Sequence, residues 1–207
     1  MKQTFITFEG PEGSGKTSVI KSVAAMLKEA GHDVLTTREP GGVAIAEQIR
    51  HVMLDVDNEA MDAKTEALLF AASRRQHVVE VILPALKQGK IVICDRYVDS
   101  SLAYQGVGRG LGIDTVFSLN QFAIGDCMPN LTLFIDVPPT TGLNRVQTNG
   151  RHMDRLDLES LSFHERVYKG YRTLIERYQE RIKVIDGTQS IDEVVEKALS
   201  HIRSIVG

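Results

Sequence analysis

The stretch that decides the fold is Phe5-Ile6-Thr7-Phe8-Glu9-Gly10-Pro11-Glu12-Gly13-Ser14-Gly15-Lys16-Thr17. Its first part is a short apolar strand, and its second part fits the phosphate-binding loop pattern of Gly, four residues and Gly-Lys-Thr, followed by a helical stretch. Glycines let the loop turn its N–H groups inward, Lys16 can bridge β- and γ-phosphates, and the Thr17 hydroxyl can hold Mg²⁺. The pattern predicts a nucleoside triphosphate site. The alternative, a glycine turn that only caps a helix, explains neither the spacing nor the Lys-Thr pair.

Length and composition predict one globular domain over residues 1–207. The chain has 43% hydrophobic and 25% charged residues and a formal net charge of −3, so there is no electrostatic case for binding a nucleic-acid polymer. The two cysteines, Cys94 and Cys127, lack metal-binding spacing and are expected to be reduced. We expect no membrane association and a cytoplasmic location, because the chain shows neither an apolar signal region nor an apolar run of about 18 residues.

Alternating apolar runs and helical periodicities predict an α/β fold. The predicted architecture is a P-loop NTPase fold, with a five-stranded parallel sheet, helices on both faces and ligands bound beyond the carboxyl ends of the strands. Strands are expected near residues 3–9, 33–37, 90–95, 131–137 and 182–186. Helices are expected near residues 16–30, 43–54, 63–88, 113–125, 139–148, 159–179 and 191–205. The polar segment at about 147–157 is predicted to be a short lid.

Two further strands end in charged residues. Asp95 and Arg96 follow the strand near 90–95, where the carboxylate can serve a Mg²⁺ shell and the guanidinium can bind phosphate oxygens. Arg38 follows the strand near 33–37, before a Pro-Gly-Gly turn. Arginines at the ends of two strands suggest a second phosphorylated ligand. Salt bridges at strand ends, or scattered surface charge, are the alternatives.

The chain resembles the thymidylate kinase family in its bacterial form. The resemblance rests on residues 8–17, Arg38-Glu39-Pro40-Gly41-Gly42, Phe70-Ala71-Ala72-Ser73-Arg74, Asp95-Arg96-Tyr97 and Asp99-Ser100-Ser101-Leu102-Ala103-Tyr104-Gln105-Gly106. These segments occur in the family's order and spacing over essentially the whole chain. The resemblance implies a nucleoside monophosphate kinase-like enzyme that phosphorylates dTMP to dTDP with ATP and Mg²⁺, a step in dTTP synthesis, and that forms a homodimer.

The resemblance also implies the site residues. ATP is expected on Gly10, Pro11, Glu12, Gly13, Ser14, Gly15, Lys16, Thr17, Ser18, Arg145 and Gln189. The dTMP is expected on Glu9, Arg38, Glu39, Pro40, Arg50, Phe70, Arg74, Arg96, Ser100, Ser101, Tyr104 and Gln105. By resemblance to the family, Phe70 is expected to stack on thymine, and Arg74, Ser101 and Gln105 are expected to contact the base. The family resemblance also implies that Ser101 leaves little room for a 2′-hydroxyl. The metal is expected on Thr17, Asp95 and Glu9.

The catalytic residues implied are Lys16, Arg96, Arg151 and Arg155. Some relatives carry an arginine in the phosphate loop, but this chain has Glu12 there and two arginines in the predicted lid, so either Arg151 or Arg155 is expected to supply the missing charge. Two alternative functions remain at this point. One is another nucleoside or nucleoside monophosphate kinase, and the other is a P-loop ATPase switch, although no Asn-Lys-x-Asp signal for GTP occurs.

Overall fold

The strands of the sheet are all parallel. The computed structural model describes residues 3–148 and 153–206. In this part of the chain the strands are β1 (Thr4–Glu9), β2 (Val34–Arg38), β3 (Ile91–Asp95), β4 (Leu131–Asp136) and β5 (Ile182–Asp186), in the order β2-β3-β1-β4-β5. The predicted α/β fold and its five strands are confirmed. Both neighbours of the central β1 follow it later in the chain, so the crevice beyond its carboxyl end is the expected ligand site.

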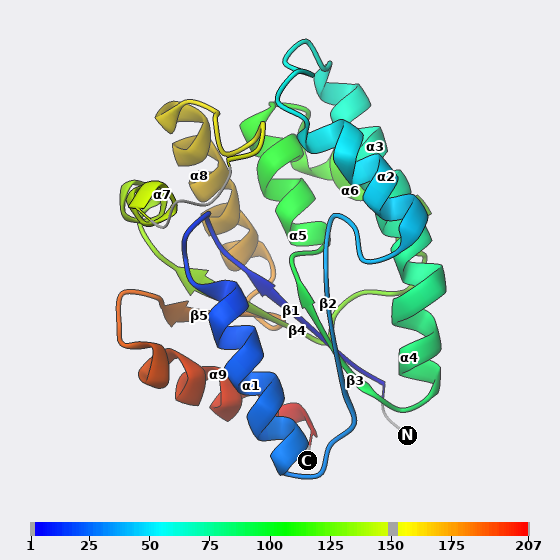
Figure 1. The fold of residues 1–207 in the computed structure, drawn as a ribbon, viewed down its shortest axis with the longest axis vertical. Helices are drawn as coiled ribbons and strands as arrows, with labels where there is room; N and C mark the ends of the chain where they lie inside the picture. The colour runs from blue at the N-terminus through cyan, green and yellow to red at the C-terminus, as the bar shows by residue number, and fades with distance from the viewer. Residues whose placement is uncertain (1–2, 149–152, 207) are drawn as a thin grey trace.

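Helices cover both faces of this sheet (Figure 1). On one face, α1 (Lys16–Glu29) and α9 (Ile191–Val206) bury residues such as Val23 and Ala198 against Ile6 and Ile93. The other face carries α2 (Ala44–Leu54), α3 (Ala63–His77), α6 (Ile113–Ile124) and α8 (Leu161–Arg177). α7 (Pro139–Thr148) follows β4 and lies beside α8. A parallel strand in the middle of the sheet is covered on both faces, and all six residues of β1 are buried.

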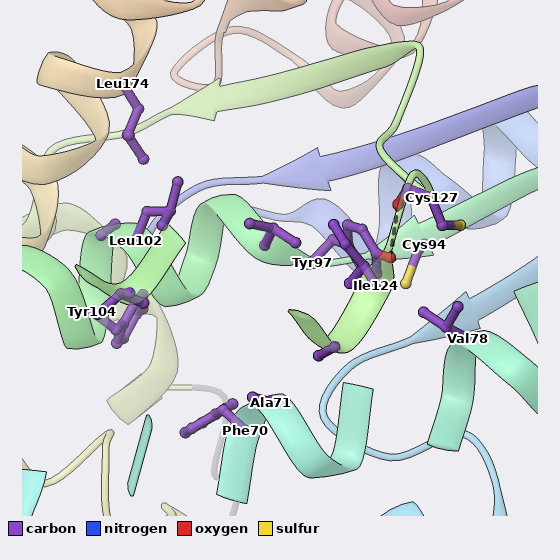
Figure 2. Close-up of a cluster of buried hydrophobic side chains, with 14 of the residues drawn as sticks. Phe70, Ala71, Val78, Cys94, Tyr97, Leu102, Tyr104, Ile124, Cys127 and Leu174 are labelled. Atoms are coloured by element: carbon purple, nitrogen blue, oxygen red, sulfur yellow. Dashed lines mark hydrogen bonds between the residues drawn. The ribbon is translucent and has the colours of Figure 1, made fainter. Parts of the chain in front are cut away.

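The apolar core on the face opposite α1 and α9 lies under α3 and α8 (Figure 2). It joins Phe70 of α3 to Leu174 of α8 through Tyr97, whose hydroxyl donates to the Cys127 carbonyl at 2.9 Å. Burial raises the pKa of this tyrosine, so the phenol stays protonated. Both cysteines are buried and free. The base-binding helix predicted at residue 70 is therefore anchored in the largest apolar cluster.

Two helical segments differ from the sequence prediction. The helix expected at 63–88 is divided into α3, the π-helical η1 (Val78–Ile82) and α4 (Leu83–Lys87). Pro84 lacks the N–H that would continue the α-helical hydrogen-bond pattern, which accounts for the changed register. Residues 98–108, where no helix was expected, form α5 (Val98–Ser101) and the π-helical η2 (Leu102–Gly108).

The segment after α7 is described only in part. The predicted lid spans 147–157, and residues 149–152, which include Arg151, lie outside the described residues. From residue 153 the chain turns back, and Arg155, Leu156 and Asp157 are buried. None of the described helices combines the length and apolarity needed to cross a membrane.

Candidate active site

The phosphate loop follows β1 at the carboxyl edge of the sheet and leads into α1. Gly13 and Gly15 have φ angles of 68° and 88°, a region that L side chains rarely adopt. A Cβ at Gly13 would also collide with the backbone of Gly142 in α7. The loop therefore needs glycine for its own turn and for the close approach of α7.

Lys16 lies inside this loop. Its Nζ donates to the carbonyls of Gly10 at 3.0 Å and Pro11 at 2.9 Å and to Ser14 Oγ at 3.2 Å. Burial, helped by the positive charge of Arg96, lowers the pKa of Lys16 to about 8. The ammonium group is thus poorly solvated, a condition that an incoming polyphosphate relieves.

Arg96 leaves β3 with a φ angle of 68°, the one positive φ angle among the described non-glycine residues. This backbone conformation costs energy in a non-glycine residue and is found at functional sites. The Arg96 Nη2 donates to Glu12 Oε1 at 2.5 Å, and its Nη1 donates to Tyr171 Oη at 3.2 Å. Glu12 of the phosphate loop is therefore paired with Arg96 at the end of β3.

Glu9 lies behind the pocket rather than in its lining. It is fully buried and accepts from Ser100 Oγ at 2.5 Å, Tyr97 N at 2.8 Å and Tyr171 Oη at 2.9 Å. Burial, helped by repulsion from Asp99, raises the pKa of Glu9 to about 7. Its visible role in the structure is to hold the backbone after Arg96.

The turn after β2 is fixed by two arginines. Arg38 Nη1 and Arg50 Nη1 each donate to the Pro40 carbonyl at 2.9 Å, and Arg38 also pairs with Glu47 at 2.7 Å. The peptide bond between Glu39 and Pro40 is cis. Both guanidinium groups line the pocket beside this turn, as expected of a phosphate clamp.

The far end of the pocket is formed by α3 and η2. Phe70 lines it from α3, and Ser101, Tyr104 and Gln105 line it from the opposite side. Behind them lies Arg74, which is 2% exposed and does not line the pocket. Arg74 donates to Glu39 Oε2 at 2.7 Å, Ser101 Oγ at 3.0 Å, the Tyr97 carbonyl at 3.0 Å and Asn120 Oδ1.

One cavity of about 450 Å³ connects the phosphate loop to this far end. The predicted site residues that line it are Glu12, Gly13, Ser14, Gly15, Lys16, Thr17, Ser18, Arg38, Glu39, Pro40, Arg50, Phe70, Asp95, Arg96, Ser100, Ser101, Tyr104, Gln105 and Arg145. Those that the structure describes outside the lining are Glu9, Gly10, Pro11, Arg74, Arg155 and Gln189. Most of the predicted site therefore converges, although it comes from segments far apart in sequence.

Two predicted residues occupy other environments. Arg155 donates to the Met53 carbonyl at 2.9 Å and to Glu66 Oε2 at 2.6 Å, so its charge faces a buried carboxylate and not the phosphate loop. Gln189 is exposed and donates to Asp186 Oδ2 at 2.9 Å. Arg145 Nη1 lies between the carbonyls of Gly13 and Gly187, at 3.5 Å from each.

Sequence reasoning missed Glu66, His77 and Arg109. Glu66 is fully buried and receives hydrogen bonds from Gln105, Arg109 and Arg155. His77 Nδ1 lies 2.9 Å from Glu39 Oε1. The one available signal was spacing, because Glu66 precedes Phe70 by one helical turn and so lies on the same face of α3.

Thr17 and Asp95 have the chemistry of a magnesium site. Thr17 Oγ1 donates to Asp95 Oδ2 at 2.9 Å, at the junction of the phosphate loop and the end of β3. Both are hard oxygen ligands, which suit a cation that keeps several waters and binds phosphate oxygens. No group of three or more acidic, histidine or cysteine ligands occurs among residues 3–148 and 153–206. A metal here would therefore take the rest of its ligands from nucleotide and water.

Fold and site together define a P-loop phosphotransferase that takes a nucleotide as its second substrate. The thymidylate kinase family model matches residues 8–198. The chain is 55% identical over 207 residues to "Thymidylate kinase" of Anoxybacillus flavithermus, covering 100% of this chain and 99% of the relative. It is 54% identical over 203 residues to "Thymidylate kinase" of Clostridium novyi, covering 98% and 99%.

A solved structure agrees with these sequence matches. The crystal structure of thymidylate kinase from Ehrlichia chaffeensis has a TM-score of 0.78 and 34% identity, and the match covers 97% of this chain and 98% of that one. The chain belongs to the thymidylate kinase family. The family resemblance predicted from the sequence is confirmed.

Proposed function

We propose that this cavity binds Mg²⁺–ATP and dTMP end to end and transfers the γ-phosphoryl group, giving ADP and dTDP. The observation that carries the proposal is the continuous cavity, which has a phosphate loop at one end, an aromatic and amide-lined end at the other and arginines between. Two anionic substrates must come within bonding distance for this reaction. The cationic middle of the cavity lowers that electrostatic cost.

The donor half begins with the glycine-rich loop, whose N–H groups cradle the triphosphate while Lys16 moves from loop carbonyls to phosphate oxygens. Arg145 is positioned to stack on the adenine, because it bridges the loop and the turn after β5. The metal is assigned to Thr17 and Asp95, and when bound it neutralises phosphate charge. Glu9 belongs to the supporting structure in this proposal.

The acceptor half binds the base between Phe70 and η2. The Phe70 ring supplies a stacking face. Arg74 supports this end from behind the pocket lining, because it donates to Ser101 Oγ at 3.0 Å and to the Tyr97 carbonyl at 3.0 Å. Gln105 Oε1 is buried and has no hydrogen-bond partner in the described part of the chain, and we assign it to accept the N–H of the thymine ring.

Transfer then depends on positioning and charge. The dTMP phosphate is held by Arg38, Arg50 and Arg96, and its oxygen is already ionised at neutral pH, so no general base is needed. Arg96 faces both substrates from the end of β3. Arg151 remains the proposed lid contact, while Arg155 is assigned to anchoring the segment after the lid, since it pairs with Glu66.

We also propose a cytoplasmic homodimer that serves dTTP synthesis. Exposed apolar side chains gather on the adjoining helices α2, α3 and α6, which Figure 1 shows side by side. They are Ile45, Val52, Leu68 and Phe122, and Phe122 is 91% exposed. Such a patch is typical of an interface. Sedimentation of the wild type as a dimer and of Phe122→Asp as a monomer would support this; a monomeric wild type would contradict it.

The proposed reaction is tested by an acceptor screen with Mg²⁺–ATP and equal concentrations of dTMP, dUMP, dCMP, dGMP, AMP and CMP. Fast product is expected with dTMP and slower product with dUMP. A preference for AMP or CMP would contradict the acceptor assignment. Slow ATP turnover that no monophosphate stimulates would point instead to a P-loop switch.

A further inference from the structure

Glu66 is a buried carboxylate at the centre of a polar network that the proposed chemistry does not use. It lies on α3 with Phe70 and Arg74 at successive turns of the same face. Its Oε1 accepts from Gln105 Nε2 at 2.9 Å and Arg109 Nε at 3.2 Å. Its Oε2 accepts from Arg109 Nη2 at 2.9 Å and Arg155 Nη2 at 2.6 Å.

The charge state of Glu66 determines which amide atom of Gln105 it contacts. Burial works against ionisation, but the hydrogen bonds from Arg109 and Gln105 outweigh it and hold the pKa of Glu66 below its ordinary value. An ionised carboxylate only accepts hydrogen bonds. Gln105 must therefore present its NH₂ to Glu66, and its Oε1 is left without a protein partner in the described part of the chain.

We infer that Glu66 is a specificity-determining residue: by fixing the Gln105 amide so that its buried oxygen has no protein partner in the described part of the chain, it selects pyrimidines that carry an N3–H. Thymine and uracil have that donor. Cytosine instead has an unprotonated N3, which would face the Gln105 oxygen as a second acceptor. The inference rests on the proposed function, since it takes Gln105 to lie at the base edge.

Replacing Glu66 by glutamine makes the inference testable in direction as well as size. Two guanidinium groups, those of Arg109 and Arg155, donate to the Oε2 position. The Oε1 position receives Arg109 Nε at 3.2 Å and the Gln105 amide, which can reverse, so the new amide oxygen is favoured at Oε2 and the new NH₂ falls at the Oε1 position. That NH₂ then donates to Gln105 and reverses its amide, which turns an N–H toward the pocket. A donor in this place suits cytosine N3 and leaves thymine N3–H without an acceptor.

The experiment measures kcat/KM for dTMP and dCMP with the full-length protein. Glu66→Gln is expected to lower the dTMP:dCMP ratio by at least ~10-fold, chiefly through opposite changes in the two KM values, because a mismatched buried hydrogen bond costs this much. Glu159→Gln is the matched control. Glu159 pairs with Arg109 at 2.5 Å and loses the same charge, but no hydrogen bond joins it to Gln105, so the ratio should stay within ~3-fold of wild type.

Glu66→Asp separates this chemical role from a structural one. The shorter carboxylate still only accepts, so the variant is expected to lose thermal stability and yet keep the wild-type ratio. A Glu66→Gln protein that folds and keeps the wild-type ratio would overturn the inference, as would an Asp variant that loses the preference to the same degree.

A second measurement decides the matter if Glu66→Gln does not fold. In the wild-type protein, the inhibition constant of dTMP methylated at N3 should be at least ~10-fold higher than the dissociation constant of dTMP, because the methylated base has no N3–H for Gln105 to accept. Equal binding overturns the inference. Failure of the proposed function looks different: wild type would then show no dTMP preference in the acceptor screen, whereas failure of the inference leaves that preference intact.

Discussion

The two ends of the cavity are built in different ways. At the phosphate end, Lys16 and its hydrogen-bond acceptors lie within one eight-residue loop, so a short piece of sequence contains most of the geometry. At the base end, Glu66, Gln105 and Arg155 come from three segments that meet only in the folded chain. Charged side chains line the phosphate end of the cavity, whereas the base end depends on buried polar contacts.

Because of this difference, we expect the phosphate end to control the rate of phosphoryl transfer and the base end to control which nucleotide is accepted. The phosphate end supplies cations wherever a triphosphate and a monophosphate meet, and it makes no contact that could distinguish one base from another. The base end places an amide and an aromatic ring in the pocket lining, and its charged side chains, such as Glu66 and Arg74, are buried and paired with other protein groups. We therefore expect substitutions at the phosphate end to change turnover and those at the base end to change acceptor binding.

The largest effect is expected for Lys16→Ala. Loss of the buried cation that we propose binds the transferring phosphate should reduce kcat by roughly 10³-fold. The Kd for dTMP, measured by calorimetry, should change little because Lys16 belongs to the other end. Lys21→Ala, an exposed lysine on the same helix, is the control. A comparable loss of dTMP affinity in the Lys16 variant would show that the ends are not separable.

Arg74→Ala should act on the base end and on stability together. It leaves Glu39 buried with His77 but without its arginine, which costs about 3–5 kcal/mol of unfolding free energy in urea titrations. The KM for dTMP should also rise far more than the KM for ATP. The neighbouring exposed Arg75, changed to Ala, provides the control. If dTMP binds the Arg74 variant as tightly as wild type, its assignment to base recognition is wrong.

Glu9→Gln should reveal electrostatic strain at the phosphate end. The raised pKa of about 7 means that the folded state favours the protonated acid, so its stabilisation is present below about pH 4.5 and is lost as the pH rises to 7. Wild type should therefore lose up to about 3 kcal/mol between pH 5 and 8 relative to the glutamine variant, which does not titrate. Urea unfolding at both pH values measures this. A difference between wild type and the glutamine variant that does not change between pH 5 and 8 would contradict the assignment.

The same contrast explains what the sequence could predict. The phosphate loop, the five strands and the charged residues after β2 and β3 follow from local patterns of apolar residues, glycines and arginines. Residues 98–108 have no clear helical period and contain Gly106 and Gly108, so α5 and η2 could not be predicted. A Cβ at Gly108 would lie 2.9 Å from Phe163, which shows that this segment is shaped by packing against α8.

The network around Glu66 could not be predicted for a related reason. An acid, a glutamine and two arginines are ordinary surface residues until tertiary structure buries them together. For Arg155, the family resemblance indicated a catalytic contact from the lid, but in the structure this arginine pairs with Glu66. Family resemblance identified residue types at the site, and only the fold revealed which of them support others.

The central claim is that the phosphate end controls the rate of transfer and the base end controls the choice of acceptor. The dTMP:dCMP ratio of kcat/KM in Arg96→Lys tests it most directly. The substitution keeps the charge but loses the planar fork that we propose binds phosphate, so kcat/KM for dTMP should fall by roughly 10–100-fold. The ratio should stay within ~3-fold of wild type, because Arg96 lies at the phosphate end. A ratio that falls in step with the rate would contradict the account.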